Sequence, residues 1–313
     1  MLHITNGGAT REPLAQSGVP GTIVSWDDVL AEGPTPLASG DEWRRVRARY
    51  LASAGNGGEE EMLRDFRAAG DALEDVAAHE EAVFWFEHDL HCQLLLIHHL
   101  WWLARHPPPS TRLSIVMGPE HLGLLKPADF PSRFEARRAI TADEIAAGAA
   151  VWTAFCGDDP RQLVPFARDA GPLTSLPRAI HRVLEEFPAV ETGLARSERQ
   201  ILQVLSEGPR SPGQAFVACA TLEEDIWMGD WSFWAIVKRL AGGADPLVAA
   251  DVDDASQRFP EGTLTLTGTG RRVLAGGADY LALSAVSRWI GGTYLTSQRA
   301  WRWTGSSLQP PAP

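Results

Sequence analysis

The chain has 313 residues, 44% of them hydrophobic and 22% charged, and a formal net charge of −12 at pH 7. This length suggests two domains, and no apolar run reaches the roughly 18 residues of a membrane-spanning helix, so we expect no membrane partner. Three scattered cysteines, Cys92, Cys156 and Cys219, and an N-terminus without the features of a secretory signal argue for a reduced, cytoplasmic protein.

The negative charge lies mainly in the N-terminal part of the chain. Residues 1–194 hold 17 Lys and Arg against 28 Asp and Glu, whereas residues 195–313 hold 11 against 12. Neither part has the basic excess that is typical of proteins binding nucleic acid without sequence preference. The composition therefore argues against a nucleic-acid partner, and it specifies neither a cofactor nor an oligomeric state.

Short apolar segments alternate with helical ones over residues 1–157. The predicted strands are Met1–Thr5, Thr22–Trp26, Ala82–Phe86, Arg112–Met117 and Arg137–Ile140. The predicted helices are Ala9–Ser17, Asp41–Ser53, Glu59–Ala77, one that follows Asp89 and one that follows the capping box at Thr141. This alternation predicts an α/β domain with a Rossmann-like, largely parallel sheet that is covered on both faces.

The rest of the chain has a different pattern. We expect a helical connector over 158–194, helical from Asp159 to Phe187, and a disordered tail over 306–313. Between them, residues 195–305 contain three predicted helices (Arg196–Glu207, Pro212–Ala220 and Trp231–Ala241) followed by two predicted strands (Pro246–Ala250 and Thr263–Thr267). Three helices followed by a two-stranded ribbon predict a C-terminal helical, winged-helix-like domain, although none of the three helices has a dense basic face.

The most informative stretch joins the buried strand Ala82–Phe86 to a helix through Glu87-His88-Asp89. Charged residues that follow a strand of a parallel sheet lie where α/β proteins bind ligands. We therefore take Glu87, His88 and Asp89 as candidate catalytic residues, and Gln93 in the following helix as a candidate ligand-binding residue. The alternative is structural: Asp89 caps the helix and Glu87 is a solvated strand end.

Two further strand ends carry candidate ligand-binding residues. Asn6, Gly7 and Gly8 follow the first strand and precede a helix, where backbone N–H groups are able to bind a phosphate. Asp27 and Glu32 follow the second strand, where dinucleotide-binding folds hold ribose hydroxyls. A tight turn is the alternative for the glycines, because the sequence lacks both GxGxxG spacing and a Walker lysine. A solvated loop is the alternative for Asp27 and Glu32, because acidic loops are common in so acidic a chain.

Histidines and a cysteine near this stretch raise the question of zinc: His88, His91, Cys92, His98 and His99. Structural zinc needs four ligands, usually as two close pairs from separate segments, and this spacing does not provide them. We therefore predict no metal ligands here. A role of Cys92 as a nucleophile is even less favoured than a metal site, although a helix N-terminus lowers the pKa of a thiol.

Several segments resemble a bacterial family catalogued as domain of unknown function eighteen thirty-five. The segments that carry the resemblance are Leu2–Gly7, Val24–Pro36, Trp85–Leu94, Val151–Pro160, Leu184–Pro188, Gly193–Leu202, Met228–Trp234 and Trp289–Leu295. The resemblance implies a domain order but no reaction. This chain departs from the family at Gly8, where NGD is more usual, and at Cys92, where an acidic residue is more usual.

These observations lead to two hypotheses about function. The first is binding of a nucleotide or other phosphorylated small molecule at the carboxyl ends of the N-terminal strands, with hydrolysis or group transfer as the candidate chemistry. The second is a non-enzymatic role, either as a ligand-sensing regulator or as a protein-interaction module, that uses the winged-helix-like domain.

Overall fold

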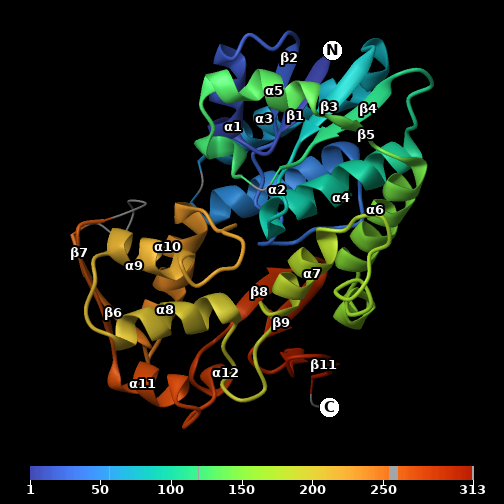
Figure 1. Ribbon diagram of the computed structural model, residues 1–313. Coiled ribbons are helices and arrows are strands. Elements are labelled where there is room, and N and C mark those ends of the chain that lie inside the picture. The colour runs from blue at the N-terminus through green and yellow to red at the C-terminus, as the bar shows by residue number, and fades with distance from the viewer. Residues whose placement is uncertain (56, 119, 254–259, 312–313) are drawn as a thin grey trace. The chain divides into compact units, whose positions relative to one another are not determined.

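The chain divides into two compact units in the computed structural model (Figure 1), which describes all residues except 56, 119, 254–259 and 312–313. Unit 1 comprises Met1–His181 together with Gly291–Thr293. Unit 2 comprises Arg182–Ile290 and Tyr294–Pro313. The division between residues 181 and 182 falls within the segment 158–194 that we expected to connect two domains.

Unit 1 is built on a five-stranded sheet with the order β2-β1-β3-β4-β5. Its strands are β1 (Leu2–Thr5), β2 (Thr22–Ser25), β3 (Glu81–Trp85), β4 (Arg112–Val116) and β5 (Arg138–Ala139). The first four are parallel, and β5 runs antiparallel to β4. The prediction of an α/β fold with a largely parallel sheet is confirmed, and this sheet fits the expected Rossmann-like class.

The four parallel strands end at the same level. Thr5 of β1 pairs with Ser25 of β2 and with Trp85 of β3, and Trp85 pairs in turn with Val116 of β4. The residues that follow each strand therefore lie at one edge of the sheet.

Helices cover both faces of this sheet (Figure 1). They are α1 (Gly8–Gln16), α2 (Gly40–Ser53), α3 (Glu59–Glu74), α4 (Leu90–Arg105), α5 (Phe130–Glu135) and α6 (Ala142–Phe155). Because side chains alternate along a strand, Val83 and Trp85 of β3 pack with Phe130 of α5 on one face. Phe84 points to the other face, where its ring centroid lies 5.6 Å from that of His99 in α4.

A capping box sets the start of α6, which packs against α4. Thr141 Oγ1 accepts a hydrogen bond from the Glu144 N–H, and Glu144 Oε2 accepts one from the Thr141 N–H, so the predicted capping box at the start of α6 is confirmed. Helix α6 packs on α4 at Gly148, where a Cβ atom would lie only 2.5 Å from Leu100 Cδ1. This glycine permits the close approach.

Unit 2 begins within α7 (Leu176–Leu184), which spans the division, and has its own core. Helices α8 (Arg196–Ser206), α9 (Pro212–Ala220) and α10 (Asp230–Ala241) precede the antiparallel strands β6 (Val248–Val252) and β7 (Gly262–Leu266). The core contains, among others, Leu202, Phe233, Val237, Leu247 and Leu264. The remaining elements are α11 (Gly268–Leu274), α12 (Tyr280–Leu283), β8 (Ser287–Ile290), β9 (Thr293–Thr296), β10 (Arg302–Trp303) and β11 (Leu308–Gln309).

Two segments differ from the expectation. Between residues 159 and 187 only the 3₁₀ turn Pro160–Leu163 and α7 are helical, because the prolines in this segment remove backbone donors. The expected disordered tail contains β11, which pairs with β10 and buries Leu308 to 6% exposure. Residues 312–313 of that tail lie outside the described residues.

None of the helices in the described part of the chain is both long and apolar enough to cross a membrane.

Candidate functional site

The predicted site residues of β1 and β3 meet at the point where the strand order reverses. The chain leaves β1 for β2 on one side, and β3 lies on the other side of β1. Asn6 follows β1 and Glu87 follows β3, and Asn6 Nδ2 donates a hydrogen bond to Glu87 Oε1 at 3.2 Å. Two strand ends that the sequence analysis named as separate candidates therefore adjoin. In open α/β sheets this position is where ligands bind.

The carboxylate of Glu87 is the centre of this group. It is 3% exposed, and it accepts hydrogen bonds from the Leu122 N–H at 2.8 Å and from His121 Nδ1 at 2.6 Å. Glu87, Asp89 and His121 each offer one ligand atom, and these atoms all lie within 4.8 Å of one another. Two carboxylates and an imidazole therefore converge beside Asn6.

Burial sets the electrostatics of the group. Removal from water raises the pKa of Glu87, and the negative charge of Asp89 raises it further. The Leu122 N–H and His121 lower it in part. A carboxylate with a raised pKa accepts a proton more readily than an exposed one. Raised pKa values are typical of general bases and of buried carboxylates whose positive ligand is absent.

The remaining residues of the turn after β3 hold its backbone. Asp89 Oδ1 accepts a hydrogen bond from the Cys92 N–H at 3.1 Å, so the predicted cap of α4 is confirmed. Gln93 Nε2 donates to the backbone oxygen of Glu87 at 2.6 Å, and His88 Nδ1 donates to the backbone oxygen of Gly118 at 3.2 Å. The side-chain amide of Gln93 therefore orients Glu87.

A second carboxylate occupies the start of α1. Gly7 precedes the helix with φ 145°, a conformation that favours glycine, and the Gly8 N–H donates to Asp27 Oδ1 at 3.0 Å. Ser25 Oγ donates to Asp27 Oδ2 at 2.5 Å. Asp27 is exposed, so its carboxylate is accessible at the position where we expected a phosphate. A phosphate at this helix start would have to displace Asp27.

Glu32 has a different environment from the other candidates. Its backbone oxygen accepts a hydrogen bond at 2.7 Å from Nη1 of Arg47, whose guanidinium also forms a buried ion pair with Asp28. Within the described residues, no hydrogen bond joins Glu32 to Asn6 or to Glu87. Glu32 thus belongs to a loop that Arg47 organises.

The histidines considered for zinc do not converge on one point. His98 and His99 are buried among aromatic rings: the His98 ring stacks on Trp43 at 4.5 Å, and the His99 ring meets Trp26 edge-on at 4.6 Å. Burial lowers the pKa of both, to about 4 for His99. These imidazoles are therefore uncharged components of the core at neutral pH.

Cys92 and His91 lie near the site. Cys92 is 1% exposed and its Sγ accepts a hydrogen bond from Asn6 Nδ2 at 3.0 Å. Burial and the charges of Asp89 and Glu87 raise the pKa of Cys92 well above its usual value, so the thiol stays protonated and is not a nucleophile. His91 Nε2 donates to the backbone oxygen of Asn6 at 3.2 Å.

Sequence reasoning missed His121. This residue lies 34 positions after Glu87, in the loop that follows β4. The signal was available, because polar residues after the other parallel strands were treated as candidates and the segment after β4 was not. The register that ends β3 and β4 at one level brings His121 to Glu87.

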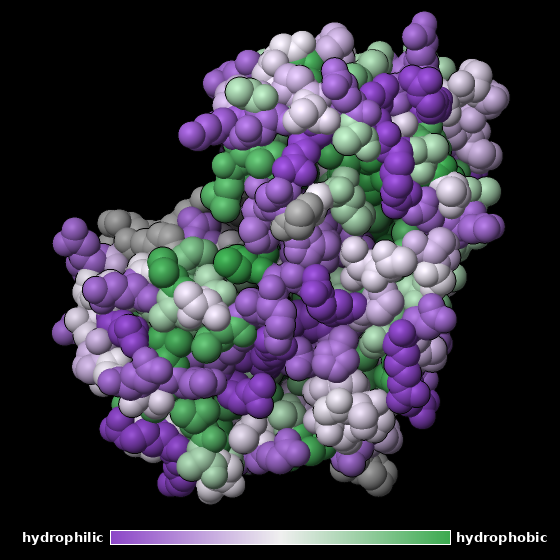
Figure 2. Space-filling view, in the orientation of Figure 1, coloured by the Kyte–Doolittle hydropathy of each residue, from purple (hydrophilic) through white to green (hydrophobic). Residues whose placement is uncertain are grey.

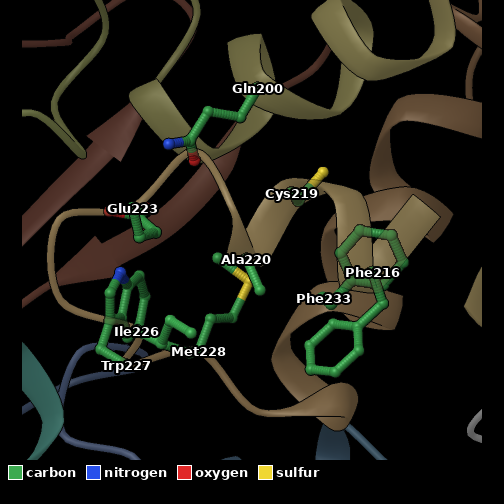
Figure 3. A pocket seen from close by; sticks show the side chains of 9 residues that line it. All are labelled: Gln200, Phe216, Cys219, Ala220, Glu223, Ile226, Trp227, Met228 and Phe233. Carbon is green, nitrogen blue, oxygen red and sulfur yellow. The ribbon is translucent and has the colours of Figure 1, made fainter. Parts of the chain in front are cut away.

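Unit 2 contains a small apolar pocket (Figure 3), and in Figure 2 hydrophobic residues reach the surface over α9 and α10. The pocket is lined by Gln200, Phe216, Cys219, Ala220, Glu223, Ile226, Trp227, Met228 and Phe233. Its volume of about 20 Å³ accommodates about one water molecule. Its carboxylate, Glu223, is bound by Arg182 at 2.7 Å. The pocket therefore has no room for a ligand larger than water, and its carboxylate is already paired with an arginine.

A scan against family models finds no match for this chain, and a search of curated proteins finds none either. The resemblance to domain of unknown function eighteen thirty-five stays a prediction.

Proposed function

We propose that unit 1 binds a nucleotide or other phosphorylated small molecule at the carboxyl ends of β1 and β3. The observation that carries this proposal is the Asn6–Glu87 hydrogen bond at the reversal of strand order, with buried Asp89 and half-exposed His121 beside it. Ligands of open α/β sheets bind at this position because the ends of two strands and two helix N-termini meet there.

The proposed roles follow from the chemistry of each side chain. Asp27 is an exposed acceptor at the end of β2, suited to hydroxyl groups of a ribose. Glu87, with its hydrogen bond from His121, is suited to act as a general base on a water molecule or a hydroxyl group. Hydrolysis or group transfer is the reaction class that this pair supports.

A thermal-shift screen of the whole chain against nucleotides and sugar phosphates tests the proposal. At least one compound is expected to raise the melting temperature of the wild type, and the shift should disappear in Glu87→Gln. The matched control is Glu60→Gln, which removes one negative charge from an exposed position of α3. The proposal fails if no compound shifts the wild type, or if Glu87→Gln keeps the full shift.

A second candidate function rests on the order of elements in unit 2. Helices α8, α9 and α10 are followed by the antiparallel β6–β7 ribbon, as in winged-helix domains. We propose as the alternative a ligand-sensing regulator or interaction module that uses this winged-helix-like part. Salt-sensitive, submicromolar binding to random duplex DNA in a gel-shift titration would favour the DNA-binding form, which the charge of −12 argues against.

A further inference from the structure

The buried carboxylates of this protein fall into two groups. Among the described residues, each buried carboxylate other than Glu87 and Asp89 has an arginine within ion-pair distance. These pairs are Asp28–Arg47 at 2.7 Å, Glu81–Arg112 at 2.6 Å, Glu144–Arg138 at 2.8 Å, Glu186–Arg182 at 2.7 Å and Glu198–Arg239 at 3.7 Å. Glu87 and Asp89, each 3% exposed, have no arginine within that distance in the described part of the chain; His121 lies 2.6 Å from Glu87, and its ligand atom lies within 4.8 Å of that of Asp89.

Two buried carboxylates without an arginine partner are costly, because each has lost its hydration and each repels the other. The fold compensates for this cost with arginine at every other such position. At the ends of β3 and β4 the compensating charge is missing from the chain itself, and the three ligand atoms already lie within 4.8 Å of one another.

We propose that Glu87, Asp89 and His121 bind a divalent first-row metal cation. A cation of charge +2 neutralises the two carboxylates, and the imidazole provides a third ligand. With the cation bound, Glu87 acts as a ligand in place of the general base described above. Three protein ligands leave coordination positions open, which is the arrangement of catalytic rather than structural metal sites. Mixed carboxylate and imidazole ligands suit Mn²⁺, Fe²⁺ or Zn²⁺ better than Ca²⁺, which takes oxygen ligands alone.

An acceptor oxygen next to the three ligands points to the same conclusion. Asn6 Oδ1 is buried without a hydrogen-bond partner, although the amide nitrogen of Asn6 donates to both Glu87 and Cys92. Asp89 uses Oδ1 to cap α4. Buried acceptors normally have donors, so the unpartnered Asn6 Oδ1 beside two carboxylates favours a positive ligand. The His121 side chain is 30% exposed, which gives an ion access from solvent.

The cation also explains how an acidic edge of the sheet receives a phosphate. Asp27, Glu87 and Asp89 all lie at this edge, and their charges repel a phosphate unless a cation lies between them. A metal with open coordination positions binds phosphate oxygens directly. This link to phosphate rests on the proposed function, whereas the metal site itself does not.

Titration of Mn²⁺ into the chelator-treated whole chain, followed by electron paramagnetic resonance and calorimetry, tests the metal site. The wild type should bind one Mn²⁺, and Asp89→Asn, Glu87→Gln and His121→Gln should each weaken binding by at least about tenfold. Asn caps a helix about as well as Asp, so Asp89→Asn removes the charge and keeps α4 intact. Glu60→Gln, at an exposed position of α3, should bind Mn²⁺ like the wild type.

The inference is overturned if the wild type binds neither Mn²⁺ nor Zn²⁺, or if folded Asp89→Asn and His121→Gln, verified by circular dichroism, bind Mn²⁺ as tightly as the wild type. A second titration with ADP and inorganic phosphate separates the two proposals. Mn²⁺ binding without any phosphorylated ligand supports the metal site and counts against the proposed function. ADP binding that is equally tight in EDTA supports the proposed function and overturns the phosphate link.

Discussion

Two strand ends of the same sheet bury acidic side chains in opposite ways. After β2, Asp28 and Arg47 form an ion pair at 2.7 Å in which both side chains are fully buried. After β3, Glu87 and Asp89 are nearly as buried but have a histidine in place of an arginine. The first arrangement is complete within the chain, whereas the second lacks a positive charge.

Hydrogen bonding shows what the complete arrangement does. Arg47 donates to both carboxylate oxygens of Asp28 and to the backbone oxygens of Val29, Glu32 and Pro34. Its donors are thus used to fix the loop after β2. Burial of a carboxylate does not by itself indicate a functional site, and the informative difference is whether the chain supplies the opposite charge.

The largest expected effect is the loss of the arginine from the paired region. Arg47→Met leaves Asp28 buried without a partner and three backbone oxygens without a donor, so we expect a loss of about 3–5 kcal/mol in unfolding free energy by urea denaturation. The control is Arg45→Met in the same helix, which breaks an exposed ion pair with Asp41 and should cost less than about 1 kcal/mol. Equal costs for the two variants would contradict the structural role of Arg47.

The dependence of stability on pH tests the burial of His99, which packs against Trp26. His99 is buried and burial lowers its pKa to about 4, so between pH 6.5 and 4 the unfolded chain binds a proton that the folded chain does not. Stability should therefore fall with pH over this window, by roughly 3 kcal/mol at its lower end. Paired carboxylates such as Glu81, whose pKa is lowered, lose their contribution at lower pH.

The variant His99→Phe isolates this effect. Phenylalanine does not titrate, so the dependence of unfolding free energy on pH between 6.5 and 4 should flatten, even if the lost hydrogen bond from Nδ1 to the Leu95 oxygen lowers stability at pH 7. An unchanged slope would assign the acid sensitivity to another group. His98, whose pKa burial and the charges of His99 and Arg47 also lower, is the first alternative.

A smaller change in unfolding free energy is expected when one carboxylate after β3 or after β2 is neutralised. In EDTA, Glu87→Gln removes a charge without an arginine partner and keeps an oxygen for the Leu122 N–H, so unfolding free energy should stay within about 1 kcal/mol of wild type or rise. The matched change Asp28→Asn removes a paired charge and should destabilise by more than that amount. If Glu87→Gln proved the more damaging of the two, Glu87 would be a structural residue.

The smallest expected effect is at the helix cap. Asp89→Asn in EDTA should change unfolding free energy by only about 0.5 kcal/mol or less, because Asn and Asp cap helices about equally well. The comparison variant Asp89→Ala should cost about 1 kcal/mol, since Ala offers no acceptor to the Cys92 N–H. Equal losses in the two variants, measured by thermal and urea unfolding, would mean that the cap is not what Asp89 contributes to stability.

Features that depend on residues close together in the chain were predictable. The apolar runs gave β1 to β4 close to their observed bounds, and Asp89 and the Thr141–Glu144 pair marked the starts of α4 and α6. Each of these signals acts within a few residues, because strand alternation and helix capping are local interactions. The sequence also pointed to Asn6 and Glu87 as polar residues that follow strands.

The partners of the buried charges were decided by tertiary structure alone. Arg47 reaches Asp28 from α2, and His121 reaches Glu87 from the loop after β4, because strand order and register place distant segments at one edge of the sheet. Glu32 is a case in which the sequence pointed to a residue outside the group. It was a candidate because it follows β2, but its backbone oxygen is bound by Arg47 in the loop that Arg47 fixes. No periodicity or spacing specifies which loop meets which, since that depends on how the whole sheet and its helices pack.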